Sequence, residues 1–104
     1  MQYLIAGHHP PDLCPAANAK IRAVAAEGAE AMPALAESLG VKVLATYLPV
    51  LNHQVFVAVE ADDANAVREL AFRARLGQWN TIEILQVPTL DEALARGREL
   101  PAIY

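Results

Sequence analysis

Four side chains in this sequence have the chemistry of transition-metal ligands. His8 and His9 are adjacent, Cys14 follows after a short proline-containing stretch, and His53 lies far along the chain. Imidazole nitrogen and thiolate sulfur together suit zinc, copper, nickel or iron. Four such ligands fill a tetrahedral site, and three leave one position open for water or a substrate. We therefore predict a metal site built from these four residues, although their spacing matches no standard motif.

A second interpretation needs no metal. Cys14 and Pro15 are expected to begin a helix, where the positive end of the helix dipole favours a thiolate. A nearby histidine would act as its base, as in a cofactor-free, isomerase-like enzyme of small organic molecules. Under either interpretation, four further residues are expected to shape a pocket beside these side chains: Tyr47, Gln78, Trp79 and Asn80.

A third interpretation involves no chemistry. Cysteine is often buried and inert, and loop histidines are often solvated or bonded to the backbone. Trp79 would then fill the end of the core or a subunit interface. The protein would be a non-catalytic binding module. Only the expected convergence of these residues at one end of a sheet favours the first two interpretations.

The elements that would position these residues follow from hydrophobic periodicity. Alternating apolar residues predict four strands, at residues 2–8, 41–47, 53–60 and 80–87. Helical periodicity predicts three helices: from Cys14–Pro15 to Leu39 with an interruption at Pro33, from a cap at Asp62 or Asp63 to Gly77, and from Thr89 to about Leu100. Gly40 is expected to end the first helix, and Thr89 with Glu92 forms a capping box.

This element order predicts an α+β fold of the ferredoxin-like βαββαβ type with an extra C-terminal helix. Right-handed crossovers then give an antiparallel sheet in the order 4-1-3-2, with helices on one face. In that topology the end of the first strand lies beside the starts of the third and fourth. The histidines, the cysteine and the tryptophan are therefore expected at one end of the sheet.

The first and third predicted strands are apolar on both faces, which predicts a covered second face. Hydrophobic residues make up 55% of the chain and charged residues 19%, so a small domain has apolar surface to spare. In length and element order the chain resembles the dimeric α/β-barrel superfamily, which includes muconolactone-isomerase-like proteins and small YCII- or GYD-type domains. The resemblance implies a homodimer, or a higher homo-oligomer, with open sheets packed together. It carries no catalytic residue across.

Composition limits the remaining function classes. The 104 residues suit a single domain, and a net charge of −4 argues against a nucleic-acid partner. No polybasic stretch or apolar run of about 20 residues suggests a membrane partner. The N-terminus is expected to be a strand and not a signal peptide, and a single cysteine favours the cytoplasm. No glycine-rich phosphate loop is present, so no nucleotide cofactor is expected.

Overall fold

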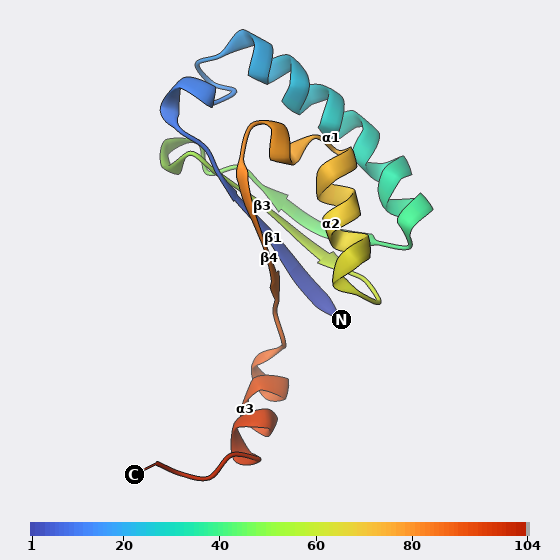
Figure 1. The fold of residues 1–104 in the computed structure, drawn as a ribbon, viewed down its shortest axis with the longest axis vertical. Helices are drawn as coiled ribbons and strands as arrows, with labels where there is room; N and C mark the ends of the chain where they lie inside the picture. Colours follow the sequence, from blue (N-terminus) through green and yellow to red (C-terminus); the bar gives the residue numbers. More distant parts are fainter. Residues whose placement is uncertain (104) are drawn as a thin grey trace.

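Figure 1 shows the computed structural model, which describes residues 1–103. Its strands are β1 (Gln2–His8), β2 (Lys42–Tyr47), β3 (Gln54–Glu60) and β4 (Thr81–Gln86). Its α-helices are α1 (Ala19–Leu39), α2 (Ala64–Arg73) and α3 (Leu90–Arg98). The chain is α+β, as predicted, with one antiparallel sheet in the order β2-β3-β1-β4. Read from the opposite edge, this order is β4-β1-β3-β2.

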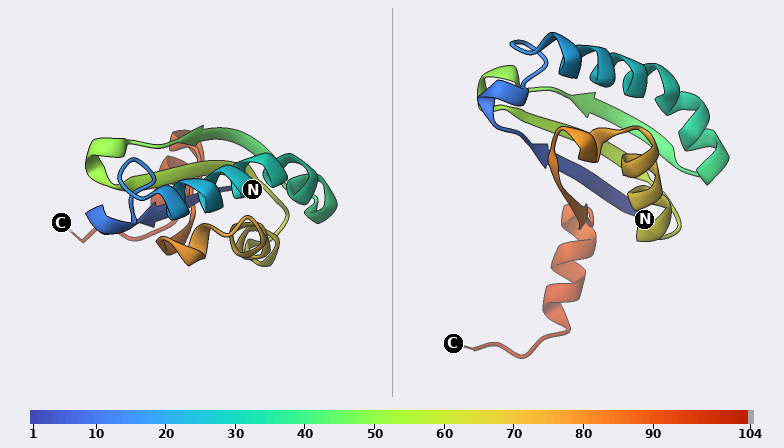
Figure 2. Two further views of the ribbon diagram at one scale, coloured as in Figure 1. Left: turned by 90° about the horizontal axis from the view of Figure 1, so that it is seen from above. Right: turned by 45° about the horizontal axis from the view of Figure 1, so that its top comes forward.

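Helices α1 and α2 cover one face of the sheet, and the main core lies between them and the strands (Figures 1 and 2). Its fully buried side chains are aliphatic, since each strand turns alternate residues toward the helices. The largest of them are Ile5, Val57, Val59, Val67 and Leu70. Helix α3 buries no residue and extends away from the sheet beyond the end of β4.

Helix α1 begins later than predicted. The side chain of Asn18 accepts hydrogen bonds from the backbone N–H groups of Lys20 and Ile21, and this cap sets the helix start at Ala19. The predicted start at Cys14–Pro15 is therefore wrong. The helix then continues through Pro33, and Gly40 ends it as predicted, with a φ of 69° in the left-handed region.

Helix α1 comes very close to the chain just after α2. A Cβ atom added to Gly28 would lie 2.1 Å from the backbone oxygen of Ala74, so only glycine permits this approach. An ion pair between Glu27 and Arg75 joins the same two segments. These contacts fix α1 against the α2 side of the molecule.

The segment before β4 differs from the prediction. Asp63, one of the two aspartates predicted as the cap, caps the start of helix α2. The helix ends at Arg73 and not at the predicted Gly77. Arg75 has a left-handed φ of 65°, which stops the helix, and a short 3₁₀ turn follows. Asn80 consequently precedes β4 instead of opening it.

Among residues 1–103, no helix covers the second face of the sheet. On β1 the residues that alternate with the core are Leu4 and Ala6, and their cross-strand partners on β3 are Ala58 and Phe56. Leu85 of β4 pairs with Leu4 on the same face. Among the described residues, no helix is both long and apolar enough to cross a membrane.

Candidate metal centre

The two adjacent histidines diverge at the end of β1. Tyr3, Ile5 and Gly7 face the helices, and the alternation carries on to His9, which is buried. His8 turns to the opposite face and is exposed. The expected ligand His8 therefore does not join the other three, because the chain stays extended at this point and keeps neighbouring side chains on opposite faces.

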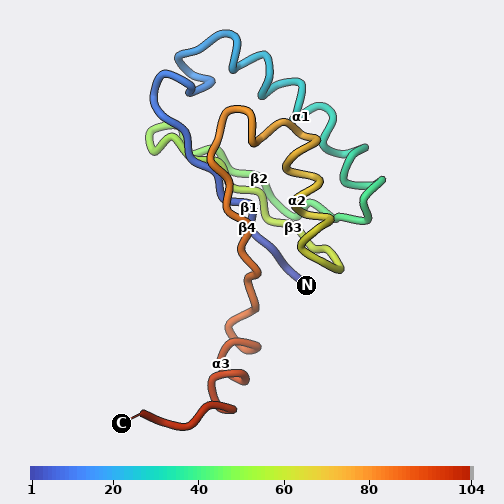
Figure 3. Tube along the Cα trace, viewed as in Figure 1, coloured from blue at the N-terminus to red at the C-terminus, as the bar shows by residue number. Residues whose placement is uncertain are grey.

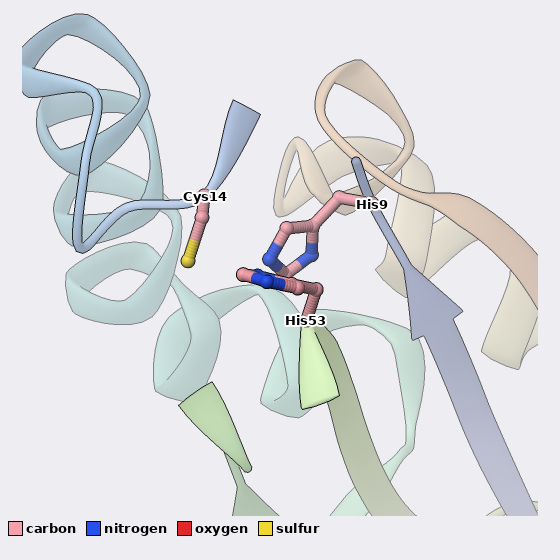
Figure 4. Close-up of side chains that lie close together, drawn as sticks. All are labelled: His9, Cys14 and His53. Carbon is pink, nitrogen blue, oxygen red and sulfur yellow. The ribbon is translucent and has the colours of Figure 1, made fainter. Parts of the chain in front are cut away.

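His9, Cys14 and His53 converge from three separate segments. Their ligand atoms all lie within 4.8 Å of one another. Figure 4 shows the three side chains pointing toward one another. The imidazole rings of His9 and His53 meet edge to face, with centroids 5.7 Å apart. Figure 3 shows the segments that carry them at the same end of the sheet.

Asn80 fixes the tautomer of His9. The Asn80 side-chain nitrogen donates to the backbone oxygen of Leu76 at 3.1 Å, so its oxygen Oδ1 faces the histidine. Nδ1 of His9 lies 2.8 Å from that oxygen. A carbonyl oxygen only accepts, so Nδ1–H of His9 is the donor. The other nitrogen, Nε2, is left with its lone pair free, which is the form that binds a metal.

His53 is held by an unusual backbone. Its φ of 53° and ψ of 47° lie in the left-handed region, which few residues other than glycine, asparagine and aspartate adopt. Its backbone oxygen accepts from the N–H of His9 at 3.0 Å, so the two histidines are also joined through the main chain. This conformation ends a short 3₁₀ turn and directs the ring toward His9.

Cys14 lies in the turn between a short 3₁₀ helix, Pro11–Leu13, and the start of α1. Its backbone oxygen accepts from the N–H groups of Ala17 and Asn18, both at 2.9 Å, and its side chain is 3% exposed. Because Cys14 is not at the N-terminus of α1, the helix-dipole argument for a metal-free thiolate enzyme loses its structural basis.

Three buried polar atoms meet at this end of the sheet. Nε2 of His9, Nδ1 of His53 and Nε1 of Trp79 have no hydrogen-bond partner within residues 1–103. A buried polar group without a partner costs about 1–3 kcal/mol. Two of the three atoms belong to the histidines of the cluster with Cys14, so an ion bound through these two nitrogens would satisfy them.

Only part of the expected pocket forms. Trp79 is buried beside His9, with ring centroids 5.1 Å apart, and Asn80 is buried as the partner of His9. Tyr47 pairs with Phe56 on the open face of the sheet and is 60% exposed. Gln78 is exposed and accepts from Arg75. The prediction that Tyr47 and Gln78 line the pocket is therefore wrong. A β-bulge near Ala45 and the 3₁₀ turn before Trp79 direct these two side chains outward.

A cavity of about 750 Å³ lies beside Trp79, between α1 and the β2 edge of the sheet. Sequence reasoning did not anticipate it. The signal was the set of small residues on one side of α1, Ala25, Ala29 and Ala36, at positions where larger side chains would have filled the space.

No protein-family model matches this sequence, and no curated protein matches it either. Among solved structures, the chain is similar to a putative transposase from Deinococcus radiodurans R1. The two are 12% identical, with a TM-score of 0.52, and the match covers 95% of this chain and 88% of that one. At this identity the likeness concerns the fold alone.

Proposed function

We propose that the protein binds one transition-metal ion through His9, Cys14 and His53. The observation that carries the proposal is the convergence of three ligand side chains, of which His9 and Cys14 are buried and His53 is half-buried. Each histidine has a buried ring nitrogen without a partner in residues 1–103. A thiolate and two imidazoles suit zinc, copper, nickel or iron. Three protein ligands leave a coordination position open, which is the arrangement of catalytic zinc sites.

The ligand atoms need a modest inward movement to hold an ion. Metal–ligand bonds of about 2.0–2.3 Å place neighbouring atoms of a tetrahedral site about 3.3–3.8 Å apart. The present separations are no greater than 4.8 Å, so closure requires at most about 1 Å of side-chain movement. Asn80 supports the assignment, since a hydrogen bond to the second ring nitrogen is the usual way to orient a metal-bound histidine.

The proposal extends to the superfamily and the assembly. The sheet order and its helix-free second face are compatible with a ferredoxin-like domain of the dimeric α/β-barrel type. Leu4, Phe56 and Ala58 make the centre of that face apolar, so a second copy packed sheet to sheet would remove them from water. The metal site lies on the other side of the sheet, so each chain would carry its own. A reducing cytoplasmic compartment would keep Cys14 a free thiol.

Titration with Co²⁺ tests the metal site directly. Tetrahedral Co²⁺ bound to a thiolate gives strong visible absorption and a thiolate-to-metal charge-transfer band. The wild-type protein is expected to develop both, to lose the band in Cys14→Ser, and to bind more weakly as the pH falls because protons compete for the ligands. His53→Asn is the variant chosen to remove the second histidine ligand. Asparagine tolerates the left-handed backbone of this position but has no imidazole ring.

Two results would contradict the metal site. One is a wild-type protein that shows no Co²⁺ spectrum and takes up no zinc. The other is a Cys14→Ser spectrum identical to that of wild type, because it would place the ion elsewhere. Rapid alkylation of Cys14 in a metal-free, active protein would instead favour the cofactor-free enzyme.

A further inference from the structure

The cavity under α1 is formed by small and apolar side chains. Half of its α1 lining is alanine, together with Met32, Pro33 and Glu37, and its floor includes Val55 and Val57 of β3. The polar residues that line it, Glu37, Lys42 and Thr46, are all exposed and therefore lie toward the solvent. Its volume of about 750 Å³ is within the range of small-molecule sites, which are mainly apolar with few polar groups.

Contacts at two places fix the position of α1 beside the cavity. Gly28 and the Glu27–Arg75 ion pair fix the helix toward α2. At its start, the guanidinium of Arg22 donates to the backbone oxygen of Pro15 at 2.9 Å. The alanines of α1 that line the cavity are too short to fill the space between this helix and the β2 edge.

Trp79 joins the cavity to the histidine and cysteine cluster. The indole lines the cavity and also lies against the ring of His9. It is 4% exposed, and its Nε1 atom is buried without a hydrogen-bond partner in the described chain. A molecule in the cavity would therefore contact an indole that touches a proposed metal ligand.

We propose that this cavity binds a small, uncharged and mainly apolar organic molecule, which is the substrate class of the metal centre. The binding site itself stands on the cavity, and only its role as a substrate site rests on the proposed metal function. Charged compounds are disfavoured because the buried wall offers no charged partner among residues 1–103.

The test uses the neutral fluorophore N-phenyl-1-naphthylamine with the metal-free 104-residue protein. Saturable binding at one site per chain is expected, with quenching of Trp79, the only tryptophan in the sequence. Ala29→Phe places a larger side chain in the lining of the cavity and is expected to weaken binding about tenfold or more. A tenfold loss of affinity corresponds to about 1.4 kcal/mol of binding free energy. Ala26→Phe is the matched control, because Ala26 is exposed on the same helix, as Ala29 is, but does not line the cavity.

The same probe is then added to Co²⁺-loaded protein, where a change in the visible spectrum is expected. No saturable binding, or equal effects of the two alanine variants, would overturn the cavity site. Binding that leaves the Co²⁺ spectrum and Co²⁺ affinity unchanged would overturn the substrate role. Failure to load Co²⁺ would remove the metal function while leaving the fluorophore result to decide the cavity by itself.

Discussion

At the scale of single residues, the site depends on a hydrogen bond that orients His9. The side-chain oxygen of Asn80 accepts a hydrogen bond from Nδ1–H of His9. The side-chain nitrogen of Asn80 donates to the backbone oxygen of Leu76, which fixes the orientation of the amide. The lone pair of Nε2 is therefore presented without any cost of changing tautomer. Outer hydrogen bonds of this kind usually tune metal affinity without abolishing binding.

Asn80→Ala is expected to lower zinc affinity about 10- to 100-fold, because the ring of His9 loses its orienting acceptor. Asn80→Asp retains an acceptor and should stay much closer to the wild-type affinity. Competition with a chromophoric chelator measures both constants, and thermal unfolding reports any loss of stability separately. Equal affinities for wild type and Asn80→Ala would show that His9 is not a ligand through Nε2.

The sequence was sufficient to bring His9, Cys14 and His53 to one end of the sheet, because strand order alone determines which strand ends are neighbours. It was not sufficient to separate His8 from His9. That distinction depends on whether the chain stays extended beyond Gly7. The left-handed backbone of His53 could not be predicted from the sequence either, because it depends on the 3₁₀ turn at Val50–Asn52.

At the scale of elements, the position of α1 controls both the core and the cavity. Gly28 is the point where this helix meets the end of α2, with no space for a methyl group. The sequence pattern does not reveal why glycine occupies this position. The start of α1 was mispredicted because Pro15 resembles a first-turn proline, whereas Asn18 provides the actual cap.

Gly28→Ala is expected to destabilise the fold by about 1–3 kcal/mol, because the added methyl group would press on the Ala74 backbone. Gly97→Ala is the matched control in helix α3, where no atom lies within 4 Å of an added Cβ. There the change should be neutral or stabilising by up to about 1 kcal/mol. Urea unfolding of both variants gives the comparison, and a Gly28→Ala midpoint equal to wild type would refute the close approach.

At the scale of the whole molecule, the two faces of the sheet differ in the residues and elements that they carry. One face carries the helices, the cavity and the candidate metal centre, and the other carries apolar residues without a helix. The apolar excess of the composition agrees with a chain that buries more surface than one domain provides. Assembly through the helix-free face would leave the site accessible in every copy.

Paired phenylalanine variants test that assembly. Phe56→Glu places a charge at the centre of the helix-free face and is expected to convert a dimer into monomers. Phe72→Glu makes the same change on α2, where the side chain is already 77% exposed, and should leave the dimer intact. Size-exclusion chromatography with light scattering distinguishes the two. A wild-type monomer at micromolar concentration would contradict assembly through this face.

The most direct test of the metal centre is the metal content of untagged protein purified without chelator, measured by mass spectrometry. The neighbouring variants His8→Ala and His9→Ala provide the comparison, because the two side chains lie on opposite faces of the sheet. About one zinc, copper, nickel or iron per chain is expected in wild type and in His8→Ala, with most of it lost in His9→Ala. A wild-type protein that is metal-free and takes up none of these ions, or equal losses in the two variants, would contradict the proposed site.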